Sequence, residues 1–150
     1  MSVTLEAIEE QQKKLSGMIA SFKLLNGTFP LTINAPILKD GEKWAGTVIS
    51  ADGTQKKHII LLPEIYEGKG KWQKVMDWAE SIGGRLPDCV EGALMFSQPD
   101  IKSEFEEDWY WTSESFSDSS AWCQSFDYGN QTGHPKGYEL RGRAVRRVLF

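Results

Sequence analysis

The sequence predicts an α+β protein in which an N-terminal helix precedes a domain of small antiparallel sheets, two helices and long loops. Three features support this: a heptad spacing of mostly apolar residues near the N-terminus, an Asp-Gly turn between two β-rich runs, and strand segments rich in Trp and Tyr from residue 109 onward. The 150 residues suffice for one domain with a short appendage. We expect an amphipathic helix over 1–25, a strand or hairpin extension over 26–57, and the main domain over 58–150.

The first predicted helix spans residues 3 to 23, and its seam positions are spaced three, four, three, four and three residues apart. This is the spacing of a coiled coil. The seam consists of Leu5, Ile8, Gln12, Leu15, Ile19 and Phe22. The polar Gln12 stands where an apolar residue would pack better, and such a residue often sets register or the number of helices. Because so short a helix is marginal alone, the sequence favours a homo-oligomer formed through it; packing on its own domain is the open alternative.

The rest of the chain alternates between strand-like and helix-like segments. Two β-rich runs, 44–50 and 56–62, flank Asp52-Gly53, which is a strong hairpin signal. The other expected elements are helices at 71–82 and 90–96, strands at 109–113, 121–128 and 143–150, and an exposed loop at 129–137 that is polar and rich in glycine.

Aromatic and charged side chains in these strands have expected positions. His58 is expected at a strand edge rather than in a metal site. Trp109 and Trp111 share one face of their strand and are expected in the core. The last strand, 143–150, alternates apolar and charged residues, so we expect half-buried framework there.

Charge is unevenly distributed along the chain, although the net charge is only −4. The stretch 100–118 holds seven acidic residues and one Lys, and the stretch 136–150 holds five basic residues and one Glu. We expect these stretches to face solvent or each other. The negative net charge argues against nucleic-acid binding, and Arg146 and Arg147, on opposite faces of a strand, form no continuous basic stripe.

Location and cofactor predictions follow from signals that the sequence lacks. No apolar run is long enough to span a membrane, and the polar N-terminus does not resemble a secretory signal, so the expected location is the cytoplasm. Cys89 and Cys123 fit no zinc or redox spacing and are expected to be reduced thiols. No cofactor and no metal are predicted.

Four segments occur in a recognisable order: GGRLP at 83–87, WYWTS at 109–113, AWCQSF at 121–126 and RAVRRV at 143–148. They resemble a bacterial and phage family of C-type-lectin-like domains of uncharacterised function, which also forms the C-terminal domain of a collagen-like adhesin. The resemblance extends from about residue 58 to the end of the chain and implies a C-type-lectin-like fold and a phage or prophage origin. Fold relatives of this family include formylglycine-generating enzymes and the variable proteins of phage diversity-generating retroelements.

Two kinds of chemistry in those relatives are poorly matched here. Formylglycine-generating enzymes hold copper with a pair of cysteines near the C-terminal end, and neither Cys89 nor Cys123 matches that pair. Gln98-Pro99-Asp100 has the composition of a calcium-lectin loop, but it precedes the Trp109 strand and no Trp-Asn-Asp segment exists. His134, in a predicted flexible loop, is poorly placed for a general base. A divergent oxidase therefore remains only as an alternative.

Binding is the function that the sequence favours. The retroelement-diversified relatives place their variable residues just before the last strand, and the corresponding stretch here is rich in Tyr, Asn, Ser and Gly, residue types that make good contact surfaces. The expected contact residues are Glu114, Ser115, Asp118, Gln124, Tyr128, Asn130, Gln131, His134, Lys136 and Tyr138. We expect a non-enzymatic module that recognises a protein or glycan, for example a host factor or defence component in the host cytoplasm. A virion or receptor-binding protein, or a retroelement-diversified one, is the alternative.

Overall fold

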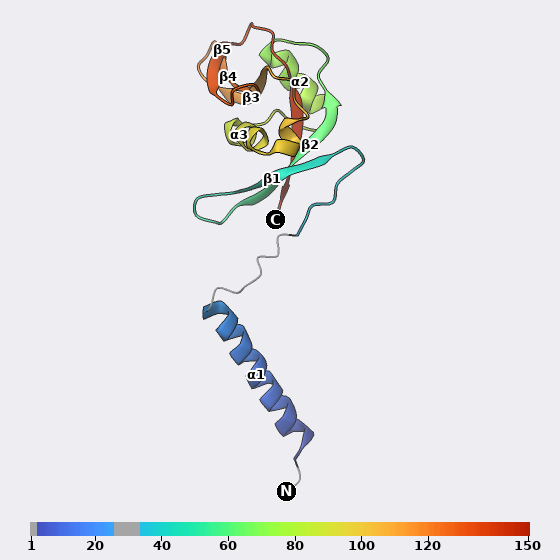
Figure 1. Cartoon of the computed structure of the whole chain (residues 1–150), viewed down its shortest axis with the longest axis vertical. Coiled ribbons are helices and arrows are strands. Elements are labelled where there is room, and N and C mark those ends of the chain that lie inside the picture. The colour runs from blue at the N-terminus through green and yellow to red at the C-terminus, as the bar shows by residue number, and fades with distance from the viewer. Residues whose placement is uncertain (1–2, 26–33) are drawn as a thin grey trace. The chain divides into compact units, whose positions relative to one another are not determined.

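The computed structural model describes residues 3–25 and 34–150. Its contacts divide the chain into two compact units, 1–35 and 36–150. The regular structure of the first unit is α1 (Leu5–Leu25), which confirms the helix predicted at the N-terminus (Figure 1). The chain is α+β, as predicted. Residues 26–33, which the predicted extension included, lie outside the described part.

In residues 36–150, two small antiparallel sheets of three strands each are combined with short helices (Figure 1). The first sheet has the order β1-β2-β6 and the second the order β3-β4-β5. The elements are β1 (Lys43–Ile49), β2 (Lys56–Ile65), α2 (Trp72–Ser81), α3 (Cys89–Ser97), α4 (Pro99–Lys102), β3 (Trp109–Ser115), β4 (Ser120–Ser125), β5 (Gln131–Pro135) and β6 (Arg143–Leu149). The four-residue α4 follows α3 directly and was not predicted.

The β1–β2 hairpin forms at the predicted turn. Gly53 has a φ of 74°, a left-handed conformation that glycine adopts without strain, and the Asp52 carboxylate accepts hydrogen bonds from the Thr54 N–H and hydroxyl. The other edge of β2 pairs with β6, so β2 is the middle strand of its sheet. The expected boundary between 57 and 58 falls inside β2, and the hairpin lies in the same compact unit as the rest of the domain.

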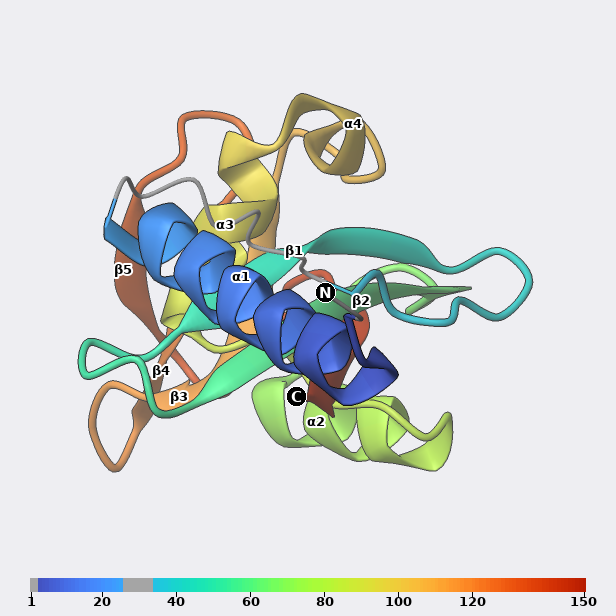
Figure 2. The same ribbon diagram turned by 90° about the horizontal axis from the view of Figure 1, so that it is seen from below.

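The buried apolar side chains of residues 36–150 form two clusters, and the middle strand β2 contributes to both. It can do so because neighbouring side chains of a strand point to opposite faces of the sheet. Ile59 and Leu61 belong to the cluster that includes Met95 of α3 and Ile101 of α4. Leu62 belongs to the cluster that includes Val75 and Ala79 of α2. Figure 2 shows α2 on one side of the β1–β2 ribbon and α3 with α4 on the other.

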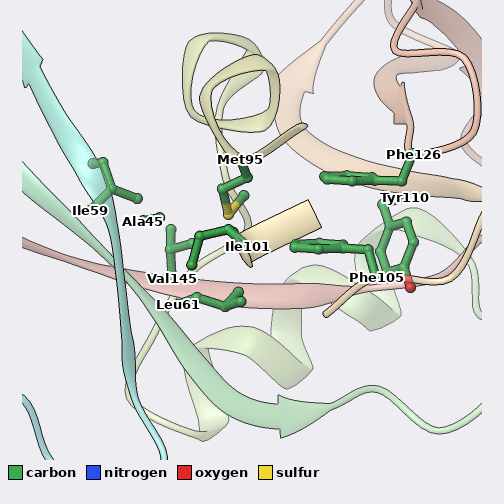
Figure 3. Close-up of a cluster of buried hydrophobic side chains, with 9 residues drawn as sticks. All are labelled: Ala45, Ile59, Leu61, Met95, Ile101, Phe105, Tyr110, Phe126 and Val145. Atoms are coloured by element: carbon green, nitrogen blue, oxygen red, sulfur yellow. The ribbon is translucent and has the colours of Figure 1, made fainter. Parts of the chain in front are cut away.

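Three aromatic rings in mutual contact attach the second sheet to this core (Figure 3). The Phe105 and Phe126 rings are stacked with their centroids 3.8 Å apart, and the Tyr110 ring meets them edge-on at 4.9 and 5.2 Å. Phe126 directly follows β4, and Tyr110 lies in β3, so the contact fixes two strands of the second sheet at once. The loops at this end of the sheet therefore start from a rigid base.

The predicted loop at 129–137 is wrong over most of its length. Residues Gln131–Pro135 form β5, which pairs with β4 through Cys123↔Thr132 and Trp122↔Gly133. β5 is an edge strand, and its sequence contains a glycine and no alternation of apolar and polar residues, so sequence analysis predicts a loop there. Pairing with β4, the strand just before it in the chain, makes this segment extended, and its own composition does not indicate that.

The position of His58 also differs from the prediction. The side chain is buried in β2 rather than at a strand edge, because β1 and β6 cover both edges of that strand. Its ring stacks on Phe150 with centroids 4.1 Å apart, and its Nδ1 is 2.8 Å from the Thr47 hydroxyl. His58 is thus a structural residue at the end of the first sheet.

Helix α3 begins with a capping box that is joined to the last strand by an ion pair. The Asp88 carboxylate accepts from the Glu91 N–H, and the Glu91 carboxylate accepts from the Asp88 N–H. Glu91 is fully buried and receives two hydrogen bonds from the Arg147 guanidinium. The preceding residue, Arg146, pairs with Glu42 instead, so the two arginines point to opposite faces as expected.

This buried pair makes the stability of the fold depend on pH. Burial alone would raise the pKa of Glu91, but the Arg147 guanidinium, the Asp88 N–H and the Lys57 ammonium together lower it below the usual 4.5. A carboxyl group whose pKa is lowered by folding stabilises the fold above its unfolded pKa, and that contribution is lost as pH falls through the folded pKa. We expect the urea midpoint to fall on acidification, and to fall less in Glu91→Gln; equal acid sensitivity of the two proteins would contradict this.

Candidate binding face

Four aromatic side chains of the second sheet and its loops are linked by ring contacts and a shared pocket, and three of them were predicted as contact residues. The rings of Trp109 and His134 meet edge-on at 5.2 Å, and the rings of His134 and Tyr138 lie 5.8 Å apart. Tyr128 and Trp109 line the same pocket. We call Tyr128, Trp109, His134 and Tyr138 the aromatic row. Tyr128 and Tyr138, at its two ends, are 85% and 56% exposed.

The turn that carries Tyr128 is held by hydrogen bonds and by one glycine. The Ser125 hydroxyl accepts from the N–H groups of Asp127 and Tyr128 at 3.2 and 3.1 Å. Gly129 has a φ of 84°, and a Cβ at that position would come within 2.3 Å of the Phe96 ring. No side chain fits there, so glycine allows the turn to lie directly on α3. The turn is therefore fixed although the Tyr128 ring projects into solvent.

An open pocket of about 300 Å³ lies at the Tyr128 end of the aromatic row. It is lined by Glu107, Asp108, Trp109, Ser125, Asp127, Tyr128 and Asn130, and we call it the acidic pocket. Within residues 3–25 and 34–150, neither Glu107 nor Asp127 makes an ion pair. The pocket therefore combines two aromatic rings with two uncompensated carboxylates.

The third carboxylate of the acidic pocket, Asp108, is compensated. It lies 2.9 Å from the Lys69 ammonium and 3.0 Å from the Arg141 guanidinium. Burial raises the pKa of Asp108, but Lys69, the Trp109 N–H and Arg141 outweigh it, so the pKa lies below 3.8. The pair Asp108–Arg141 also confirms that the acidic and basic stretches of the sequence partly face each other.

Lys136 and Asp118, two further predicted contact residues, connect neighbouring parts of the domain. The Lys136 ammonium lies 4.6 Å from the centre of the Trp72 ring and donates to the Asp118 carbonyl at 3.1 Å. The Lys136 carbonyl accepts from the Trp72 N–H. These contacts hold the β3–β4 turn, in which Asp118 lies, against the start of α2. A partner would meet a Lys136 that already has a cation–π contact and a hydrogen bond.

Gln124 and Gln131 were predicted as contact residues, but their side-chain amides bond to other parts of this chain. Gln124 is buried, and its amide donates to the carbonyls of Ser125 and Gly129 and accepts from Gln131. Gln131 also donates to the Cys89 carbonyl at 2.7 Å. The two amides connect the 126–130 turn, β5 and the start of α3, so they stabilise the face from beneath. Strand alternation places Gln124 on the face opposite Ser125, which composition alone did not show.

Glu114 and Ser115 lie at the far end of β3, beside an irregularity in its pairing with β4. Both are exposed. Glu114 forms a hydrogen bond with the Cys89 thiol at the start of α3, and this contact helps to raise the pKa of that thiol. Asn130, by contrast, lines the acidic pocket as a predicted contact residue should.

Trp109 is the residue of this face that sequence reasoning missed. It was expected in the core with Trp111, and Trp111 is indeed fully buried. Trp109 is only half-buried, because it is the first residue of β3 and lies where the sheet opens to the pocket. A position at a strand end directly after an acidic run was the only signal that could have indicated this.

The two cysteines are poorly suited to thiolate chemistry. Burial raises the pKa of Cys89 to about 12, with Glu114 adding to the effect, and burial raises the pKa of Cys123 to about 12 as well. Both are free thiols, and only a negligible fraction of each would be ionised near neutral pH. In the described part of the chain, no group of three or more His, Cys, Asp or Glu side chains is arranged to hold a metal ion.

Comparisons with known proteins give no information about the function of this face. The sequence matches no protein-family model, and no curated protein matches it. Among the helices of the described residues, none is both long and apolar enough to cross a bilayer.

Proposed function

We propose that this chain is a non-enzymatic binding module whose aromatic row and acidic pocket recognise a basic segment of a protein partner. The observation that carries the proposal is the pairing of exposed Tyr128 and half-buried Trp109 with the free carboxylates of Glu107 and Asp127 in one pocket. A Lys or Arg side chain satisfies both features at once, since it can lie over a ring and pair with a carboxylate. Exposed aromatic residues in such a position usually supply most of the binding energy.

We further propose that residues 36–150 adopt a C-type-lectin-like fold. The four segments that carry the resemblance support this, because they meet as pairs. Arg85 of the first segment exchanges two backbone hydrogen bonds, of 3.0 and 2.8 Å, with Val145 of the last. The middle two segments pair as β3 and β4. The resemblance is also the ground for proposing a phage or prophage origin, with a host factor, a defence component or a virion protein as partner.

A glycan and an oxidase substrate are the competing ligands. Aromatic rings also stack on sugars, but a neutral sugar would leave the carboxylates of Glu107 and Asp127 unpaired, so a cationic protein segment fits better. The oxidase alternative requires reactive thiols, and the raised pKa values of Cys89 and Cys123 weigh against it.

The test is binding of the full chain to arrays of lysine- and arginine-rich peptides, matched acidic peptides and neutral glycans. We expect retention on basic peptides only, with affinity falling as salt rises. Once a peptide is selected, Tyr128→Ala combined with Tyr138→Ala should weaken binding by about tenfold or more, at about 1.4 kcal/mol per factor of ten. Because both rings are exposed, the thermal midpoint should stay nearly unchanged.

The charge contribution is tested by Glu107→Gln combined with Asp127→Asn. The matched control is Glu67→Gln with Glu80→Gln, two exposed carboxylates outside the pocket. Weaker binding in the pocket variant and unchanged binding in the control support the proposal. Equal binding in both, or retention on neutral glycans instead of basic peptides, would place the function elsewhere.

A further inference from the structure

Helix α1 carries the seam predicted from the sequence, and the apolar side chains of that seam are exposed. Leu5, Ile8, Leu15 and Ile19 are 47 to 69% exposed. They follow the spacing of three and four residues that keeps side chains in line along a supercoiled helix. Exposed apolar side chains arranged in such a line mark an interaction surface rather than ordinary solvent-facing helix.

The width of this seam indicates what covers it. A helix that packs on a sheet or a globular surface usually has a broad apolar stripe, whereas a strict seam fits a second helix. On α1 most positions beside the seam are polar, and the apolar exception is Met18, next to Ile19. Thr4 and Gln11 lie on one side, and Glu9 and Ser16 lie on the other. A second helix with the same period is therefore the occupant that the pattern fits.

Gln12 distinguishes between orientations of that second helix. We propose that α1 forms a parallel, in-register coiled coil with α1 of a second copy of this chain, in which the two Gln12 amides meet at the centre. In the antiparallel arrangement Gln12 would face Leu15, and its amide would be left without a partner in an apolar layer.

The charged residues are compatible with this arrangement. Glu6, Glu10, Lys13 and Lys14 lie at positions away from the seam, where they face solvent. Across a parallel seam the flanking contacts bring Glu9 near Thr4 and Ser16 near Gln11, so no like charges are opposed. A dimer of this kind would present two binding faces on one assembly, although the inference does not depend on what those faces bind.

The first experiment measures the mass of the full-length protein by sedimentation equilibrium. We expect a self-associating species, and a monomer for Leu15→Lys, which places a charge in the seam. Ala20→Lys adds the same charge at a position of α1 outside the seam and should leave the association unchanged. All six tryptophans lie in residues 36–150, so their fluorescence reports whether the second unit stays folded in each variant. A monomeric wild-type protein at high concentration, or association unaffected by Leu15→Lys, would overturn the proposal.

The second experiment determines orientation. Gln12→Cys should give a covalent dimer under mild oxidation, because the two introduced thiols face each other only in a parallel, in-register pair. Gly17→Cys, on the outer face of the same helix, is the matched control and should remain uncrosslinked. The wild-type protein should also remain uncrosslinked, since Cys123 is buried and Cys89 is partly buried. Association without cross-linking of Gln12→Cys would rule out the parallel register.

Discussion

The Arg147→Met variant is expected to lose about 3–5 kcal/mol of its free energy of unfolding, because it leaves a buried carboxylate without its main partner. Glu91 is fully buried at the start of α3, and Arg147 of β6 donates two hydrogen bonds to it. The Lys57 ammonium, 3.4 Å away, compensates the carboxylate only in part. Urea unfolding followed by tryptophan fluorescence measures the loss.

Lys43→Met is the control for removing a positive charge. Lys43 pairs with Glu104, but both side chains are partly exposed, so this change should cost no more than about 1 kcal/mol. Replacing both members of the buried pair, as Glu91→Leu with Arg147→Met, should recover part of the loss, because no buried charge is then left unpaired. Recovery stays incomplete since the Asp88 N–H loses its acceptor. A loss in Arg147→Met no larger than in Lys43→Met would show that the pair is not an important contact.

Arg143→Met is expected to lose about 2–4 kcal/mol of its free energy of unfolding. One buried and one partly buried carbonyl group lose their donors, at about 1–3 kcal/mol each, and removal of the buried charge offsets part of this cost. Arg143 is 2% exposed. Its guanidinium donates to the Glu104 carbonyl at 2.6 Å and to the Leu62 carbonyl at 3.0 Å, and it lies 5.2 Å from the centre of the Phe105 ring. It therefore joins β2 and β6 to the segment that precedes β3.

Methionine retains much of the Arg143 stem, so the variant isolates the guanidinium rather than the packing. Arg143→Lys should also be destabilised, since one ammonium cannot reach both carbonyls in the geometry of the planar group. The control is Arg141→Met, whose partly exposed pair with Asp108 should contribute at most about 1 kcal/mol. Equal stability of Arg143→Met and Arg141→Met would mean that the carbonyls find other donors.

Arg143 also shows where sequence reasoning about β6 was incomplete. The alternation of apolar and charged residues predicted a half-buried strand, but Arg143, Ala144 and Val145 are all buried. An arginine can be buried there because two carbonyls from other parts of the chain face it. Such acceptors are far away in the sequence, so alternation cannot reveal them.

The sequence predicted which segment of the chain contains the candidate site, but not which residues of that segment and its surroundings belong to it. Tyr128, Asn130, His134 and Tyr138 were predicted as contact residues because ring and amide residues between two strands are typical of a contact surface, and the structure places them in the aromatic row or the acidic pocket. Trp109 was missed and Gln124 wrongly included, because the difference between them depends on where the second sheet is covered. Trp109 lies at the open end of β3, whereas Gln124 is buried. The turn on Gly129 and the pairing of β3 with β4 decide that, and both depend on contacts with α3 and the core.

The sequence by itself determined the elements whose signals are local. The heptad of α1, the turn at Asp52-Gly53 and the apolar face of α2 each lie within one short segment, and local periodicity or turn chemistry is enough to form them. Only the tertiary structure decided that 131–135 is a strand, that His58 is buried and that Trp109 faces a pocket. The ring of His58 packs on Phe150 from the far end of the chain, and Trp109 lines a pocket with residues of the β4–β5 turn. The strand at 131–135 pairs with β4, its neighbour in the chain. In all three cases pairing and burial against other elements select the conformation, and local composition does not reveal those contacts.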